Sequence, residues 1–174
     1  MTVESSAQPL ILTLELARPA FERFEALRRA HFPPERNFIP AHLTLFHALP
    51  GDQLAGIRLK LAEICAATPD VPLRFPALRS LGRGVAVVVD SPALVALRGR
   101  LAAAWAGWLS PQDRQGYRPH ITVQNKVAPE LARQLYAELA ASWAPFEALG
   151  AGLLLWRYLG EPWELVEEFG FANV

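Results

Sequence analysis

Apolar positions along the chain recur with two periods, one typical of strands and one typical of helices. The helical period is seen after Pro19, where Phe21, Phe24 and Leu27 share one face and charged residues occupy the other. The strand-like segments are short runs of apolar and β-branched residues, and several begin at a proline. The pattern predicts helices over residues 19–32, 52–67, 92–109 and 129–143. It predicts strands over residues 9–17, 41–49, 72–81, 84–90, 119–127, 146–159 and 163–171.

Local signals mark where the helices begin. Pro19 and Pro129 suit a first helical turn, because a proline there removes no intrahelical hydrogen bond. Ser91 followed by Pro92 is typical of an N-cap and a first helical residue, and Asp52 is a candidate N-cap for the second helix. These signals support the four predicted helices.

The order of the predicted elements repeats. The strands that begin near residues 41 and 119 are each followed by a helix, a strand, a turn and a second strand. The repetition predicts an α+β fold of two lobes related by a pseudo-twofold axis, each an antiparallel sheet with helices on its outer face, and a cleft between them. We expect residues 1–174 to form a single domain built from duplicated halves, approximately residues 1–90 and 91–174.

The two repeated strands carry the same pattern, His-x-Thr. His42-Leu43-Thr44 lies in the first strand and His120-Ile121-Thr122 in the second. Because strand side chains alternate between faces, each motif presents one imidazole and one hydroxyl on the same face. A proton-transfer group beside a hydrogen-bond donor, present twice, suits phosphoryl chemistry, with one copy for each reacting oxygen. The alternation also predicts four side chains that point into a core, namely Leu43, Leu45, Ile121 and Val123.

Two less specific interpretations of these residues stay open. Two unrelated strand histidines can form hydrogen bonds within a core. A metal site is disfavoured, because catalytic zinc generally has three protein ligands and no carboxylate or third histidine lies near either motif; we therefore predict no metal and no cofactor. His47 is an odd number of positions from His42 and is predicted to point away from the site. His31 ends a helix, where a cation complements the helix dipole.

Composition and charge narrow the class of protein. A hydrophobic fraction of 52% excludes a disordered chain. Lysine plus arginine equals aspartate plus glutamate at 17 each, which disfavours a structural RNA-binding protein but allows a local cluster for one phosphate ester. Cys65 is the only cysteine, as is typical of a reducing compartment.

No apolar run reaches the roughly twenty residues that span a bilayer, and residues 1–9 lack a signal-peptide layout. We expect a cytoplasmic monomer without membrane association.

The paired His-x-Thr motifs, each on a strand and each opening a similar run of elements, resemble those of the 2H phosphoesterase superfamily, which includes 2′–5′ RNA ligases and cyclic phosphodiesterases. The resemblance covers nearly the whole chain. It implies a phosphodiesterase acting on 2′,3′-cyclic phosphate ends or nucleotides, or on 2′–5′ phosphodiester bonds, with ligation as the reverse reaction. His42 and His120 would be general base and general acid, with His120 the implied base in hydrolysis, and Thr44 and Thr122 would bind non-bridging oxygens. The chain departs from the bacterial RNA ligases at Phe46, where they commonly have an arginine.

Substrate contacts outside the motifs are predicted from strand parity and charge. Gln124 and Lys126 follow Thr122 on the same strand face. Each of the further candidates is alternatively a surface charge or, for the tyrosine, a core aromatic: Tyr117, Arg118, Arg83 and Arg36. The expected partner is a nucleotide or an RNA-end phosphate ester. A non-catalytic module that binds such a ligand in the same cleft is the alternative function.

Overall fold

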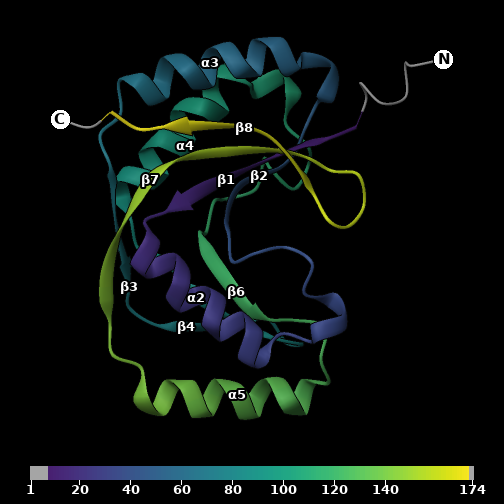
Figure 1. The fold of residues 1–174 in the computed structure, drawn as a ribbon, viewed down its shortest axis with the longest axis vertical. Coiled ribbons are helices and arrows are strands. Elements are labelled where there is room, and N and C mark those ends of the chain that lie inside the picture. Colours follow the sequence, from purple (N-terminus) through teal and green to yellow (C-terminus); the bar gives the residue numbers. More distant parts are fainter. Residues whose placement is uncertain (1–7, 173–174) are drawn as a thin grey trace.

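The fold is α+β and has two antiparallel sheets (Figure 1). The computed structural model describes residues 8–172. Residues 1–7 lie outside the described residues, and they include most of the segment predicted to lack a signal-peptide layout. The larger sheet has the order β2-β1-β7-β3 with β8 beside β7, and the smaller has the order β4-β5-β6. The strands are β1 Leu10–Leu16, β2 Leu43–Leu49, β3 Val71–Phe75, β4 Leu78–Ser80, β5 Val85–Val88, β6 His120–Gln124, β7 Phe146–Arg157 and β8 Glu164–Gly170.

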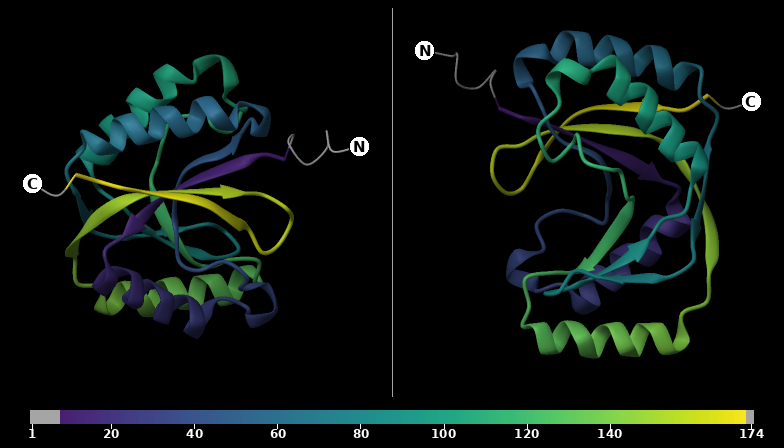
Figure 2. Two further views of the ribbon diagram at one scale, coloured as in Figure 1. Left: turned by 45° about the horizontal axis from the view of Figure 1, so that its top comes forward. Right: turned by 180° about the vertical axis from the view of Figure 1, so that it is seen from behind.

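Each sheet has two helices on its outer face, so that the molecule has two lobes (Figures 1 and 2). Helices α3 and α4 lie over the larger sheet and contact β8 and β3. Helices α2 and α5 lie over the smaller sheet, where α2 contacts β6 and α5 contacts β4 and β5. The helices are α2 Arg18–His31, α3 Leu54–Ala66, α4 Pro92–Ala104 and α5 Pro129–Ser142, with short 3₁₀ turns η1 Pro34–Arg36, η2 Gly51–Gln53 and η3 Ala106–Trp108. Within residues 8–172 no helix is long and apolar enough to cross a membrane.

Each sheet contains strands from both halves of the sequence. The segment predicted as one strand over residues 72–81 divides at Pro76 and Ala77 into β3, which pairs with β7, and β4, which pairs with β5. Pro76 has no N–H to continue the ladder, and the chain there passes from one sheet to the other. Strand β6 of the second half then pairs with β5, while β7 and β8 join the larger sheet. The boundary near residue 90 therefore does not separate the two sheets.

The helix starts follow the sequence signals with one exception. Ser91 Oγ accepts the N–H of Leu94 at 3.1 Å and donates to the carbonyl of Pro72 at 2.7 Å, so the predicted N-cap also attaches α4 to β3. The prediction of Asp52 as an N-cap is wrong. Asp52 lies inside the 3₁₀ turn η2, and no side chain caps α3.

The two motif strands share an irregularity directly after the motif. On β2, Thr44 lies opposite Thr13 and Phe46 opposite Leu12, so that Leu45 is an extra residue. On β6, Thr122 lies opposite Ala86 and Gln124 opposite Val85, so that Val123 is an extra residue in the same place. Each bulge interrupts the alternation of faces beyond it. The four side chains predicted to point into the core, two from each motif strand, are at most 1% exposed, which confirms that prediction.

Candidate active site

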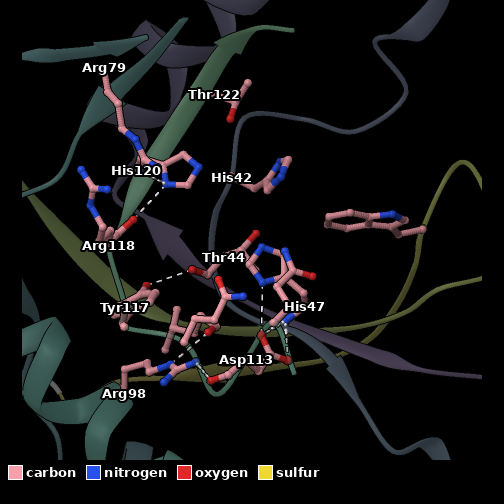
Figure 3. A pocket seen from close by; sticks show the side chains of 15 residues that line it. His42, Thr44, His47, Arg79, Arg98, Asp113, Tyr117, Arg118, His120 and Thr122 are labelled. Carbon is pink, nitrogen blue, oxygen red and sulfur yellow. Dashed lines mark hydrogen bonds and ion pairs between the residues drawn. The ribbon is translucent and has the colours of Figure 1, made fainter. Parts of the chain in front are cut away.

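The two motifs line one cavity between the sheets, of about 480 Å³, which we call the central cavity (Figure 3). The side chains of both motifs lie on its wall, together with polar residues from the loop that precedes β6. Its lining consists of His42, Thr44, Leu45, His47, Arg79, Arg98, Gln112, Asp113, Gln115, Gly116, Tyr117, Arg118, His120, Thr122 and Trp163. Within residues 8–172, no three histidine, cysteine, aspartate or glutamate side chains are grouped to hold a metal ion.

Both motif histidines are held in the same tautomer by the backbone. His42 Nδ1 lies 2.9 Å from the carbonyl oxygen of Pro40, and His120 Nδ1 lies 2.9 Å from that of Arg118. A carbonyl oxygen only accepts hydrogen bonds, so Nδ1 carries the proton and donates it in each case. The Nε2 atom of each ring is thereby left to give or take a proton.

The surroundings of the two rings lower both pKa values. Burial is the largest cause for His42 and lowers its pKa to about 4, with smaller contributions from the charges of Arg28, His47 and His120. Burial also lowers the pKa of His120, and the nearby cation Arg79 acts in the same direction. Arg79 Nη1 lies 3.4 Å from His120 Nδ1, but Nδ1 already donates its proton, so Arg79 is a neighbouring charge and not its hydrogen-bond donor. An anionic phosphate in the cavity would favour the protonated form of a neighbouring histidine.

Two buried arginines bind backbone carbonyls at the bulges. Arg98 on α4 donates from Nε to Leu45 O at 3.2 Å, and Arg28 on α2 donates from Nη1 to Thr122 O at 3.0 Å. Each helix thus holds the motif strand that belongs to the other half of the chain. Arg28 also donates to Asn37 Oδ1, at 3.2 Å from Nε and 3.1 Å from Nη2.

Further contacts join the first motif to the loop before the second. Arg98 Nη2 donates to the carbonyl of Asp113 at 2.7 Å, and its guanidinium lies 4.9 Å from the centre of the Tyr117 ring. The Tyr117 hydroxyl donates to the carbonyl of Thr44 at 2.9 Å (Figure 3). Thr44 and the segment leading to His120 are therefore fixed relative to each other.

His47 lines the cavity, so the prediction that it points away is wrong. The parity argument assumed an uninterrupted strand, whereas the bulge at Leu45 turns the third residue after Thr44 toward the cavity. Its Nδ1 lies 3.2 Å from Asp113 Oδ1, and its imidazole side chain is 45% exposed. His31 ends α2 and does not line the cavity.

A model of the 2′-5′ RNA ligase superfamily matches residues 16–162. The chain belongs to this superfamily. Three solved structures share the fold of this member. TT0787 of Thermus thermophilus has 16% identity and a TM-score of 0.63, and the match covers 95% of this chain and 98% of that chain. A phosphoesterase has 20% identity and a TM-score of 0.63, with 96% of this chain and 99% of that chain covered, and E. coli LigT complexed with 3′-AMP has 18% identity and a TM-score of 0.62, also with 96% of this chain and 99% of that chain covered. No curated protein matched the chain. The recognition of the 2H phosphoesterase superfamily and of its two-lobed α+β fold is confirmed.

The residues predicted to contact substrate in this superfamily member divide into two groups. Tyr117 and Arg118 line the cavity beside the four motif side chains. Gln124 does not line the cavity. The bulge at Val123 places its side chain on the opposite face of β6 from the one predicted, and Gln124 is only 7% exposed. Three more predicted residues also lie outside the cavity lining, and their role stays a prediction: Lys126, Arg83 and Arg36. Arg83 Nε donates to the carbonyl of Val127 at 3.1 Å.

Several cavity residues were missed by the sequence analysis. Trp163 lies after the turn between β7 and β8, and its ring centre is 5.1 Å from that of His42. Arg79 and Asp113 come from a short strand and a polar loop, respectively. Nothing in the local pattern marks these positions, because only the long-range pairing of the sheets brings them to the cavity.

Proposed function

We propose that the protein is a metal-independent phosphodiesterase that acts on 2′,3′-cyclic phosphate ends or nucleotides, or on 2′–5′ phosphodiester bonds, with ligation as the reverse reaction. The observation that carries the proposal is the pair of motif histidines on one cavity, each with Nδ1 on a backbone carbonyl two residues earlier. Two imidazoles that each keep Nε2 for proton transfer are what a base and an acid require. In keeping with this substrate class, LigT, which shares the fold, has been solved with 3′-AMP.

In the proposed hydrolysis, the neutral histidine takes a proton from water at Nε2 as the water oxygen attacks phosphorus. The bond from phosphorus to one ribose oxygen breaks, and the protonated histidine gives its Nε2 proton to that oxygen. The hydroxyls of Thr44 and Thr122 donate to the non-bridging oxygens, where negative charge increases in the transition state. These four side chains supply the acid, the base and two donors to the non-bridging oxygens.

Two considerations bear on which histidine is the base. His42 has a pKa of about 4 and is readily neutral, which favours His42 as the base. The family resemblance implies His120. Because the rings are held in the same way, the assignment depends on their surroundings and is decided by the leaving-group experiment described at the end of the Discussion.

The test is a screen of purified protein against 2′,3′-cyclic nucleotides, oligonucleotides with cyclic phosphate ends and 2′–5′ dinucleotides, with 3′–5′ dinucleotides as the control. We expect turnover of at least one of the first three classes, retained after prolonged chelation in metal-free buffer. A protein that holds these compounds unchanged through a single-turnover assay is the non-catalytic module instead. Loss of turnover on chelation, with recovery on added zinc or manganese, would contradict metal-independent catalysis.

A further inference from the structure

A third histidine enters the central cavity with its own carboxylate partner. Asp113 accepts the backbone N–H groups of His47, at 2.9 and 3.0 Å, and of Ala48, at 3.0 Å. These donors lie where β2 contains a second extra residue, since Phe46 is opposite Leu12 and Leu49 is opposite Leu10. The Asp113 carboxylate thus satisfies backbone groups that the irregular ladder leaves free.

The same carboxylate fixes the ring of His47. Asp113 Oδ1 lies 3.2 Å from His47 Nδ1, and the Asp113 side chain is 1% exposed. Burial alone would raise the pKa of Asp113, but its hydrogen bonds to His47 and Ala48 outweigh that effect and lower the pKa, so the group is a carboxylate. A carboxylate accepts, so Nδ1 of His47 carries a proton and the remaining nitrogen is turned to the other side of the ring (Figure 3).

The free side of this ring faces the part of the cavity that holds the two motifs. Figure 3 shows the imidazole of His47 between Asp113 and the motif histidines, next to Thr44. Its charge also contributes to lowering the pKa values of both His42 and His120, so it lies near both. Three arginines line the same cavity, namely Arg98 from α4, Arg79 from β4 and Arg118 before β6.

We propose that His47, held by Asp113, is a third substrate-contacting histidine, which donates from Nε2 to an oxygen of the phosphoryl group bound between the two motifs. This rests on the proposed function, because it names a further contact for the same phosphate ester. An imidazole placed between a carboxylate and a phosphate oxygen binds both as the imidazolium, with one N–H for each. The phosphate anion supplies the second acceptor.

The contact differs in kind from those of the motif histidines. His47 transfers no proton in the reaction, and its hydrogen bond to a phosphate oxygen exists in the bound substrate as well as in the transition state. Losing it should raise KM more than it lowers kcat, the sign of an interaction made in both states. Loss of His42 or His120 should instead lower kcat.

The first experiment titrates inorganic phosphate into the full-length protein by calorimetry, for wild type, His47→Ala, His47→Gln and the control His31→Ala. A charge-assisted hydrogen bond predicts a dissociation constant raised roughly 10- to 100-fold in His47→Ala and by less in His47→Gln, which keeps a neutral donor. His31→Ala, on the end of α2, should match wild type. An unchanged dissociation constant in both His47 variants overturns the proposal.

The second experiment measures KM and kcat for a hydrolysed cyclic nucleotide in the same variants and in Asp113→Asn. We expect KM raised roughly 10- to 100-fold in His47→Ala with kcat within a few-fold of wild type. Asp113→Asn should shift KM in the same direction. If this variant does not fold, the His47 variants still test the inference, because the His47 side chain is partly exposed and its replacement should leave the fold intact. Turnover by wild type with an unchanged KM in His47→Ala overturns this inference and leaves the proposed function standing. If wild type turns over nothing, the proposed function fails, and the phosphate titration still decides the role of His47.

Discussion

The two motif strands can be compared position by position. Both β2 and β6 carry His-x-Thr, both place the histidine Nδ1 on a carbonyl two residues earlier, and both contain an extra residue after the threonine. They differ in what surrounds the ring: His42 packs against Trp163, whereas His120 lies beside Arg79. The local backbone therefore makes the histidines alike, and the tertiary surroundings make them different.

The bulges also explain why two arginines are buried. A bulge interrupts the ladder and leaves backbone groups that need partners elsewhere. Arg98 binds a carbonyl at the first bulge, and Arg28 binds one at the second. Because α4 holds β2 and α2 holds β6, the two halves of the chain fix each other's motif.

Removing either motif histidine should have the largest effect. General acid or base catalysis contributes roughly 10²–10⁴ to the rate, so His42→Ala and His120→Ala should each lose about that factor in kcat. The double variant should be hardly worse than either single variant, because acid and base act together. Steady-state kinetics of the three variants checks this, and near-normal turnover by one single variant would show that the two rings are not equivalent partners.

Next in size are the threonine hydroxyls. Valine is nearly isosteric and favours strands, so Thr44→Val and Thr122→Val should keep the melting temperature. Each should lose about 1.5–3 kcal/mol of transition-state stabilisation, since a donor to an ionised oxygen is removed. Comparing kcat/KM of the two variants also shows whether both motifs contact the phosphate equally. Wild-type rates in both would make the threonines structural only.

The buried arginines should affect stability more than chemistry. Methionine keeps the length of the side chain but none of its donors, so Arg28→Met and Arg98→Met each leave a buried carbonyl without a partner. Each substitution should lower the free energy of unfolding by about 1–3 kcal/mol. For a chain of this size, each kcal/mol corresponds to roughly 2–4 °C in Tm. Calorimetry with exposed Arg18→Met as the control checks the prediction. If Arg28→Met and Arg98→Met both melt at the same temperature as Arg18→Met, the proposed role of the bulge contacts is contradicted.

An effect confined to acidic pH follows from the lowered pKa of His42. Its folded-state pKa of about 4 lies below the unfolded value of about 6.5, so the unfolded chain binds more protons between these two values. This contribution to stability is fully present above the unfolded pKa and is lost as the pH falls toward the folded one. Urea unfolding over this range should give a flatter pH dependence for His42→Gln than for wild type or His31→Gln. Equal slopes in all three proteins would show that His42 does not carry the difference.

The sequence predicted the features that depend on local pattern. The four core side chains of the motif strands and the Ser91 cap follow from alternation and capping. The two-lobed fold follows from the repeated order of the elements, and the family resemblance implies the same fold. The errors arise where tertiary structure interrupts a local rule. The bulges reverse the parity of His47 and Gln124, and the passage between sheets at Pro76 divides a predicted strand. Trp163, Arg79 and Asp113 reach the cavity through pairings between distant segments, and no local spacing records such pairings.

The central claim is that one motif histidine is the acid and the other the base, and the leaving group tests it most directly. A substrate whose departing oxygen is replaced by sulfur, or that releases nitrophenolate, scarcely needs a proton as it leaves. The variant that lacks the acid should then recover most of its rate, while the variant that lacks the base stays slow. Recovery of His120→Ala assigns the acid to His120, as the pKa of about 4 for His42 favours. Recovery of His42→Ala assigns it to His42, as the family resemblance implies. Equal recovery of both variants, or of neither, would contradict the division of roles.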